Sequence, residues 1–238
     1  MTVTSQINSL PLRNCVLDEK SHKYFWDPGG LNEQMVTSVT SVINFFKPPY
    51  SGPPDAGPRG THVHRWMYYK ATGNFPSDLT SQGIDVLGTH TPEGIDCTNW
   101  IEILANLSFW KKIEVMAAEY TMVNRKRSLG GQLDLLVRKE NGEKVLIDLK
   151  TKSATWNGPT EKEKKGWMAQ AGGYCDLLDS GDENRGGVWV DKAVTLVITP
   201  EQAVWVPGKG ESYDMYECGH LWTDAWLTYL AYIEANPF

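Results

Sequence analysis

The chain has 238 residues, of which 41% are hydrophobic and 22% are charged, as in a folded globular protein. This length suits a single domain built around one sizeable core. The formal net charge of −6 argues against a protein that wraps duplex nucleic acid without regard to sequence, although it leaves room for a local basic groove.

The sequence also indicates where in the cell the protein is expected. No apolar run is long enough to span a bilayer, and the first residues lack the apolar segment of a signal peptide. We therefore expect a soluble, cytoplasmic protein that does not contact a membrane. The four cysteines are scattered without a CxxC pair, which favours isolated thiols over a zinc ribbon or disulfides.

The first 59 residues form an N-terminal extension in this interpretation. They contain a short strand-like segment at 24–26 and a short helix in the stretch TSVTSVINFF, opened by Thr37 or Ser38. Residues 47–60 are rich in proline and glycine and are expected to form a loop.

Helices and strands then alternate. Helices are expected at about 61–71, from Cys97 onward, at 161–178 behind a Thr160/Glu163 capping box, and at about 218–234. Strands are expected at 113–123, 132–138, 143–150, 193–198 and 203–206, and residues 73–96 have an irregular pattern. This order predicts one mixed α/β (α+β) domain over 1–238, with a central mixed β-sheet that contains an antiparallel meander, flanking helices, and a C-terminal helix within 207–238.

Two acids lie on neighbouring strands of the predicted meander, joined by Glu140-Asn141-Gly142. A two-residue Asn-Gly turn sets Asp134 opposite Leu149, whereas a three-residue loop with a left-handed Gly142 sets Asp134 opposite Asp148. Only the second register pairs apolar side chains with one another on one face and gathers Asp134, Asp148 and Lys150 on the other. We therefore adopt the three-residue loop.

Two carboxylates directly across a strand pair repel each other, so a shared proton, a cation or solvent must offset their charge. Lys150 leaves one negative charge uncompensated, and oxygen ligands favour a hard divalent cation such as Mg²⁺ or Mn²⁺. The alternative is a surface hairpin whose acids are solvated.

The residues around these acids resemble the motifs of the PD-(D/E)XK nucleases, particularly the RecB-like branch. GGQLD at 130–134 and IDLKT at 147–151 resemble the Gly-x-x-Asp and Asp-x-Lys-Thr motifs, GTHVH at 60–64 resembles Gly-Thr-x-x-His, and QAGGY at 170–174 resembles Gln-x-x-x-Tyr. The four motifs occur in the family's order. The stretch VTSVTSVINFF is similar to the N-terminal segment of phage and mitochondrial genome maintenance exonucleases, which is compatible with a phage-encoded protein.

The resemblance implies a restriction-endonuclease-like core over 60–206 and metal-assisted hydrolysis of DNA phosphodiester bonds with one or two Mg²⁺ or Mn²⁺ ions. It assigns catalysis to Asp134, Asp148 and Lys150. It assigns metal binding to His64, Asp134, Asp148, the carbonyl of Leu149 and Glu119. For His64 and Glu119 the alternatives are an ordinary helix histidine and a solvated strand acid.

Substrate contacts are expected from residues around this centre. They are Gln170, Tyr174, Thr151, Arg125, Lys126, Arg127 and Trp156, with the lysines at 162, 164 and 165 flanking the other side. Trp156 suits a base-stacking platform. Tyr174 and Trp156 are equally compatible with the core.

We expect a DNA exonuclease that prefers single strands or ends, because the acidic chain restricts affinity to a local site. One alternative is a non-catalytic nucleic-acid-binding or assembly factor on the same fold, and another is a structure-selective endonuclease. The C-terminal cysteine group of the iron–sulfur members is missing, so no iron–sulfur cluster is expected.

Overall fold

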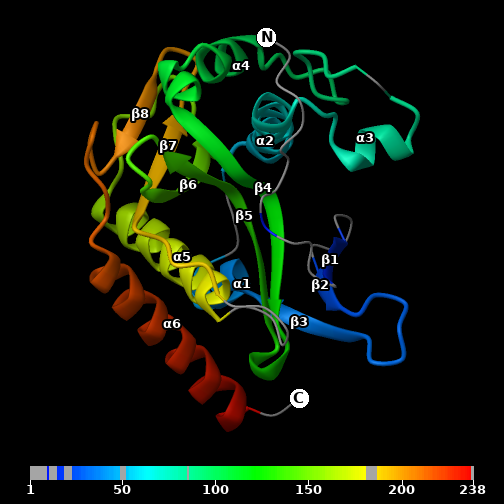
Figure 1. The fold of residues 1–238 in the computed structure, drawn as a ribbon, viewed down its shortest axis with the longest axis vertical. Coiled ribbons are helices and arrows are strands. Elements are labelled where there is room, and N and C mark those ends of the chain that lie inside the picture. Colours follow the sequence, from blue (N-terminus) through cyan, green and yellow to red (C-terminus); the bar gives the residue numbers. More distant parts are fainter. Residues whose placement is uncertain are drawn as a thin grey trace.

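The computed structural model describes residues 10, 15–18, 23–48, 52–84, 86–180 and 187–236. Within these residues an eight-stranded mixed sheet forms the middle layer, and helices cover both of its faces (Figure 1). The strands are β1 (Cys15–Asp18), β2 (Lys23–Trp26), β3 (Gln34–Ser38), β4 (Ile113–Asn124), β5 (Leu129–Lys139), β6 (Lys144–Thr151), β7 (Lys192–Ile198) and β8 (Ala203–Val206). The helices are α1 (Val39–Asn44), α2 (Ala56–Thr72), α3 (Ser77–Ser81), α4 (Thr98–Ala105), α5 (Glu161–Asp179) and α6 (Met215–Ala235). This confirms the expected mixed α/β fold.

The strand order is β1-β2-β3-β5-β6-β7-β8, and β4 pairs with β5 off this path. The meander β4-β5-β6 is antiparallel, whereas β6 pairs with β7 in parallel. The α5 crossover joins those two parallel strands. β7 and β8, two strands expected from the sequence, form an antiparallel hairpin.

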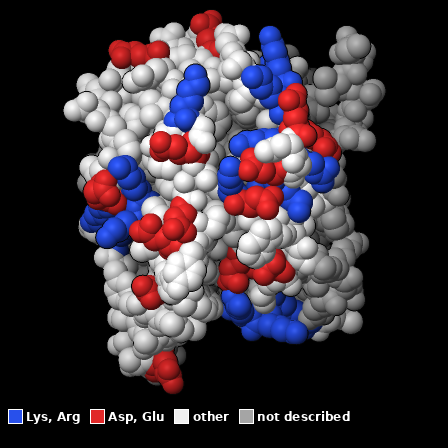
Figure 2. All heavy atoms as spheres, turned by 60° about the vertical axis from the view of Figure 1, so that its left-hand side comes forward, with Lys and Arg blue, Asp and Glu red and all other residues white. Residues whose placement is uncertain are grey.

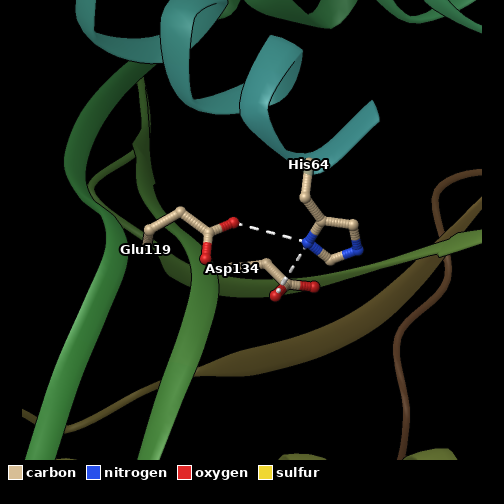
Figure 3. Close-up of side chains that lie close together, drawn as sticks. All are labelled: His64, Glu119 and Asp134. Carbon is tan, nitrogen blue, oxygen red and sulfur yellow. Dashed lines mark hydrogen bonds and ion pairs between the residues drawn. The ribbon is translucent and has the colours of Figure 1, made fainter. Parts of the chain in front are cut away.

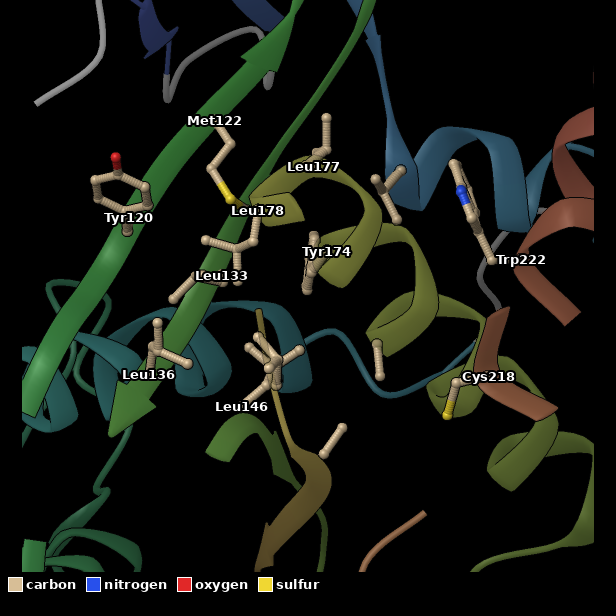
Figure 4. Packing of buried hydrophobic residues seen from close by; sticks show 14 of the residues in the cluster. Tyr120, Met122, Leu133, Leu136, Leu146, Tyr174, Leu177, Leu178, Cys218 and Trp222 are labelled. Atoms are coloured by element: carbon tan, nitrogen blue, oxygen red, sulfur yellow. The ribbon is translucent and has the colours of Figure 1, made fainter. Parts of the chain in front are cut away.

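Two hydrophobic clusters fix the layers. On one face, α2 and α4 pack on the sheet through side chains such as Val63, Met67 and Leu104, together with Val145 and Ile147 of β6. On the other face, α1, α5 and α6 pack on β4, β5 and β6. Figure 4 shows the side chains of this second cluster, with Leu133, Leu136 and Leu146 of the sheet facing Leu177 and Leu178 of α5. The sheet is therefore buried on both faces, as a mixed sheet with helical crossovers requires.

Two glycines bring the second helical layer together. A Cβ on Gly172 would lie 2.2 Å from the carbonyl oxygen of Cys218 in α6, and a Cβ on Gly173 would lie 2.7 Å from Val39 Cγ1 in α1. Both contacts are too close for any side chain. The glycine pair in QAGGY is therefore explained by the close approach of α1 and α6 to α5.

The helix starts test the sequence-based expectations. α1 begins after Ser38, whose Oγ accepts a hydrogen bond from the N–H of Ser41 at 2.9 Å, which confirms one of the two expected caps. α2 begins at Ala56, five residues earlier than expected, so the stretch 47–60 is only partly a loop. Pro58 is tolerated there because the first helical turn needs no partner for its N–H groups. Residues 49–51 of that stretch lie outside the described residues, and α3 occupies part of the segment expected to be irregular.

The β5–β6 hairpin adopts the three-residue loop. The N–H of Lys139 donates to the carbonyl of Glu143 at 2.9 Å, and Gly142 has a φ of 88°. The pairs then run from Arg138 with Lys144 to Leu135 with Ile147, which confirms the expected register.

The ladder ends two pairs earlier than expected, since neither Asp134 and Asp148 nor Leu133 and Leu149 are paired. β5 pairs with β3 at Leu129 and Gly130 and with β6 from Leu135 to Arg138, and between these two stretches no described strand pairs with this side of β5. Asp134 and Asp148 are thus not a bonded cross-strand pair. Since like charges directly opposite are destabilising, the parting of the strands relieves the repulsion that the sequence predicts.

Candidate active site

Three side chains from three elements meet where the strands part. His64 projects from α2 towards Glu119 on β4 and Asp134 on β5 (Figure 3). Its Nδ1 lies 3.4 Å from Glu119 Oε1 and 3.4 Å from Asp134 Oδ1. Potential ligand atoms of the three residues all lie within 4.8 Å of one another. One nitrogen and two carboxylates at this spacing suit a divalent cation.

The backbone of β4 is unusual at this point. Glu119 has a φ of 45°, in the left-handed region that costs a residue with a side chain about 1–2 kcal/mol. Its neighbours Ala118 and Tyr120 are two residues apart, yet they belong to the hydrophobic clusters on opposite faces of the sheet. The alternation of side chains along β4 is therefore reversed at Glu119, and the residues after it face the opposite side of the sheet. Strain of this kind is often found at functional sites.

The same reversal corrects one detail of the predicted hairpin. Leu133 was expected to share an apolar face with Leu135 and Val137, but it packs with Leu136 and Leu146 in the cluster on the other face. The side chains of β5 change from one face of the sheet to the other at Asp134, which lies across from Glu119 on β4. The alternation of a regular strand fails there because β5 leaves β6 at this point.

Asp134 is held by the neighbouring strand. Its Oδ2 accepts a hydrogen bond from the N–H of Leu149 at 2.6 Å, and the residue is 8% exposed. Burial opposes ionisation, but His64, Lys150 and the Leu149 N–H together keep the pKa of Asp134 below its usual value. This carboxylate is therefore ionised at neutral pH.

Asp148 lies deeper and is 2% exposed. Its Oδ1 accepts a hydrogen bond from Lys150 Nζ at 2.9 Å, whereas its Oδ2 is buried without a hydrogen-bond partner in the described part of the chain. Burial raises the pKa of Asp148 to about 6, and the charge of Asp134 adds to the rise while Lys150 opposes it. A buried carboxylate oxygen without a partner is costly, so it calls for a ligand.

Lys150 joins the acids to α5. Its Nζ donates to Asp148 Oδ1 and, at 3.1 Å, to Gln170 Oε1. Gln170 Nε2 in turn donates to Tyr174 Oη at 2.9 Å. Burial lowers the pKa of Lys150, but the negative charges of Asp148 and Asp134 raise it by more than burial lowers it. The pKa of Lys150 therefore lies above its usual value, and the ammonium stays charged.

Tyr174 is 4% exposed and belongs to the core cluster. A Cβ on Gly131 would lie 2.9 Å from its ring, so the glycine before Asp134 makes room for this tyrosine. The tyrosine therefore orients Gln170 from within the core. A direct contact of Tyr174 with substrate stays a prediction.

The pKa of His64 is set by the two acids beside it. Burial would lower the pKa of His64, but the charges of Asp134 and Glu119 and the hydrogen bonds to them raise it well above the usual value. Without a cation the imidazole thus carries the positive charge between the two acids. A divalent ion held by His64, Glu119 and Asp134 fits this donor set, and Asp148 Oδ2 is a further oxygen without a partner nearby.

The other predicted residues lie around this centre or away from it. Thr151 approaches α2, since a Cβ on Gly60 would lie 3.5 Å from Thr151 Oγ1. Trp156 packs against the core cluster, and its indole N–H is buried without a partner among the described residues. Leu149 is fully buried, and ligation through its carbonyl stays a prediction.

The basic turn lies farther out than expected. Arg125, Lys126 and Arg127 form a 3₁₀ turn (Arg125–Arg127) at the tip of the β4–β5 hairpin. Five residues of strand separate this turn from Glu119, so the Cα atoms of Glu119 and Arg125 are up to about 20 Å apart. Arg127 is paired with Asp176 of α5. Substrate contacts from this turn stay a prediction, and they need a strand that extends well beyond the acids.

A three-layer α/β/α domain that gathers acids, a histidine and a lysine at a break in its sheet is typical of metal-dependent hydrolases. The model of the PD-(D/E)XK nuclease superfamily matches residues 47–231, so the chain belongs to that superfamily. This membership agrees with the restriction-endonuclease-like core expected from the four motifs. The superfamily consists mostly of nucleases. Membership in it, together with a group that could hold a metal ion, suggests metal-dependent hydrolysis of nucleic acid.

No curated protein matches the chain. Among solved structures, the crystal structure of SSO0001 is similar at 16% identity and a TM-score of 0.35, covering 84% of this chain and 80% of that one. A likeness this distant does not bear on the activity. None of the helices in the described part of the chain has the length and apolarity needed to cross a membrane.

Proposed function

We propose that the protein is a DNA exonuclease that depends on Mg²⁺ or Mn²⁺ and prefers single strands or DNA ends. The observation that carries this proposal is the meeting of Asp134, Asp148 and Lys150 where β5 and β6 part, with His64 and Glu119 completing the ligand set. Superfamily membership supports hydrolysis of a phosphodiester.

Each residue has a separate task in this proposal. Asp134, Glu119 and His64 hold a cation, with Asp148 supplying a further oxygen. A bound divalent ion would polarise the scissile phosphate and lower the pKa of the attacking water.

Lys150 places a charged ammonium beside this group. The ammonium orients the attacking water and stabilises the negative charge that develops on the phosphate. Gln170 limits the movement of Lys150, because Lys150 donates simultaneously to Gln170 and Asp148. The lysine is therefore preorganised before substrate binds.

The preference for single strands or ends is supported by the charge distribution. Figure 2 shows basic and acidic side chains intermixed on one face of the molecule, without a broad basic surface there. Together with the net charge of −6, this favours a local contact over a long duplex track.

The test uses linear and closed circular DNA, each single- and double-stranded, incubated with Mg²⁺ or Mn²⁺. We expect the wild type to degrade linear single strands fastest and Asp148→Asn to lose activity by at least a factor of 10³, since a ligand and the partner of Lys150 are both altered. Cleavage of closed circles would replace the exonuclease by an endonuclease. Binding without any cleavage would favour the non-catalytic alternative.

A further inference from the structure

A second depression lies beside the candidate active site. It has a volume of about 380 Å³ and opens between α1 and the first turns of α5. Ligand pockets in proteins typically have volumes of roughly 300–1,000 Å³. Three lysines, Lys47, Lys150 and Lys162, line its wall. They come from the segment after α1, from β6 and from the first turn of α5.

The ammonium of Lys47 is held in place against α5. Its Nζ donates to Asn44 Oδ1 at 2.8 Å, and a Cβ on Gly166 would lie 3.5 Å from the same Nζ. The ammonium thus lies at van der Waals distance from the place of a Cβ at Gly166. Lys47 therefore reaches from the end of α1 to the helix that carries Gln170.

The depression contains positive charge without a matching acid. In the described part of the chain, neither Lys47 nor Lys162 forms an ion pair with a carboxylate. Glu163 also lines the wall, but it already accepts from Lys152 at 2.6 Å and from the N–H and hydroxyl of Thr160. Its charge is therefore committed to Lys152 and to the helix cap.

The lysines also act on one another. Burial lowers the pKa of Lys47, and the charges of Lys162 and Lys150 lower it further. An anion between the three ammonium groups would remove this repulsion, and phosphate is the anion that lysines commonly bind in proteins. Without an anion, the repulsion between these ammonium groups is not offset.

The depression is continuous with the chemistry of the site. Lys150 and Gln170 both line it, and the same Lys150 Nζ contacts Asp148. A phosphate bound between Lys47 and Lys162 would thus be a close neighbour of a phosphate at the acids. On a nucleic acid strand, the next phosphate along the backbone occupies such a place.

We propose that this depression is a phosphate-binding subsite, in which Lys47 and Lys162 hold the phosphate adjacent to the scissile one on the bound strand. The inference rests on the proposed function, since it takes the strand at Asp134 and Asp148 as its reference point. It assigns to Lys47 a role in substrate binding that lies outside the four sequence motifs.

The experiment compares Lys47→Gln, Lys162→Gln and the double variant with Lys111→Gln. Lys111 is exposed in the turn before β4 and lines a separate depression beside Arg138, so its loss is a matched change of charge. Binding of a single-stranded oligonucleotide is measured with chelator present, over a range of salt concentrations. Cleavage with Mn²⁺ is measured separately, and thermal unfolding verifies that each variant is folded.

We expect each pocket variant to weaken binding by about tenfold. The slope of log Kd against log salt should fall by about 0.7 for each lost phosphate contact on a single strand. Lys111→Gln should change neither quantity appreciably. Pocket variants that match Lys111→Gln in both would overturn the subsite.

Oligonucleotides with a 5′-phosphate, a 3′-phosphate or no terminal phosphate, and a closed single-stranded circle, identify the phosphate. A loss confined to one terminal phosphate supports a subsite for the strand end, and an equal loss on the circle supports a subsite for an internal phosphate. The two proposals fail separately. Binding that depends on the lysines without any cleavage rejects the nuclease alone, whereas cleavage by the wild type with binding unaffected by the lysines rejects the subsite alone.

Discussion

The backbone N–H of Leu149 donates a 2.6 Å hydrogen bond to the carboxylate of Asp134, and this bond joins two strands at the point where their ladder has ended. Leu149 directly follows Asp148, so the same short segment fixes the position of both acids. The two carboxylates thus stay close without facing each other as a regular cross-strand pair. This arrangement allows like charges to share one site.

Removal of a ligand carboxylate should weaken cation binding. We expect Asp134→Asn and Glu119→Gln each to lower the affinity for Mn²⁺ by at least tenfold, because each removes one charged oxygen from the group with His64. Isothermal titration calorimetry measures this affinity. Glu114→Gln is the matched control, since Glu114 lies on β4 but pairs with Arg138 at 3.0 Å. An equal loss in the control would contradict the assignment of the site.

Gln170 should act through Lys150. We expect Gln170→Leu to lower kcat by about 10- to 100-fold with little change in KM, because the ammonium loses the acceptor that orients it. Gln170→Glu keeps an acceptor and should restore most of the rate. Steady-state kinetics on a single-stranded substrate separates kcat from KM. A rise in KM alone would instead assign Gln170 to substrate binding.

Tyr174→Phe removes the hydroxyl that fixes the amide of Gln170. We expect a smaller loss of kcat than for Gln170→Leu, since Gln170 can still accept from Lys150. The ring stays in the core, but Nε2 of the buried Gln170 loses its acceptor, so the free energy of unfolding should fall by about 1–3 kcal/mol. A variant with wild-type kcat would show that the hydroxyl does not orient Gln170.

The raised pKa of Asp148 should make the free energy of unfolding of the metal-free protein depend on pH. Its folded-state pKa of about 6 lies above the ordinary value of 3.8, so the native state binds the extra proton between these limits. The native state therefore loses stability as the pH rises from about 4 to about 6, by up to about 3 kcal/mol. Asp148→Asn lacks this titration.

Thermal unfolding of wild type and Asp148→Asn without metal, from pH 4 to pH 8, measures this effect. The stability of the variant relative to wild type should increase through the window and level off above about pH 6. A constant difference across the window would show that Asp148 titrates normally. Added Mn²⁺ should raise the wild-type melting temperature most at the high end of the range, where the carboxylate is ionised.

The left-handed backbone at Glu119 can be tested apart from its carboxylate. We expect Glu119→Gly to be more stable than Glu119→Ala by about 1 kcal/mol, because glycine adopts a φ of 45° without the cost of a Cβ. Chemical denaturation measures both free energies of unfolding. The same two substitutions at Thr121, on the same strand but with no positive φ, should rank in the opposite order. Identical rankings at the two positions would argue against strain at Glu119.

The sequence predicts the local parts of this site well. The pattern of β5 and β6 and the left-handed Gly142 were enough to set the hairpin register, and Thr160 with Glu163 was enough to start α5. These features depend on neighbours within a few residues. The four motifs likewise led to the superfamily that the chain belongs to.

The parts that the sequence did not predict depend on distant contacts. β5 parts from β6 before Asp134, and nothing within either strand signals that change. The turn at Glu119 is set by the opposite packing of Ala118 and Tyr120 on two helical layers. Lys47 is one lysine in a proline-rich stretch, and only the approach of α1 to α5 brings it near Lys150. Tertiary packing overrides the local pattern at each of these places.

His64 and Gln170 reach the same site from helices on opposite faces of the sheet (Figure 1). Neither helical layer can therefore assemble the site without the other. A chain that has docked only one layer lacks either the histidine beside the acids or the amide that orients Lys150. In the proposed nuclease, hydrolysis therefore requires both layers to be docked on the sheet, and a partly unfolded chain would leave nucleic acid intact. Activity, in turn, reports whether both layers have docked.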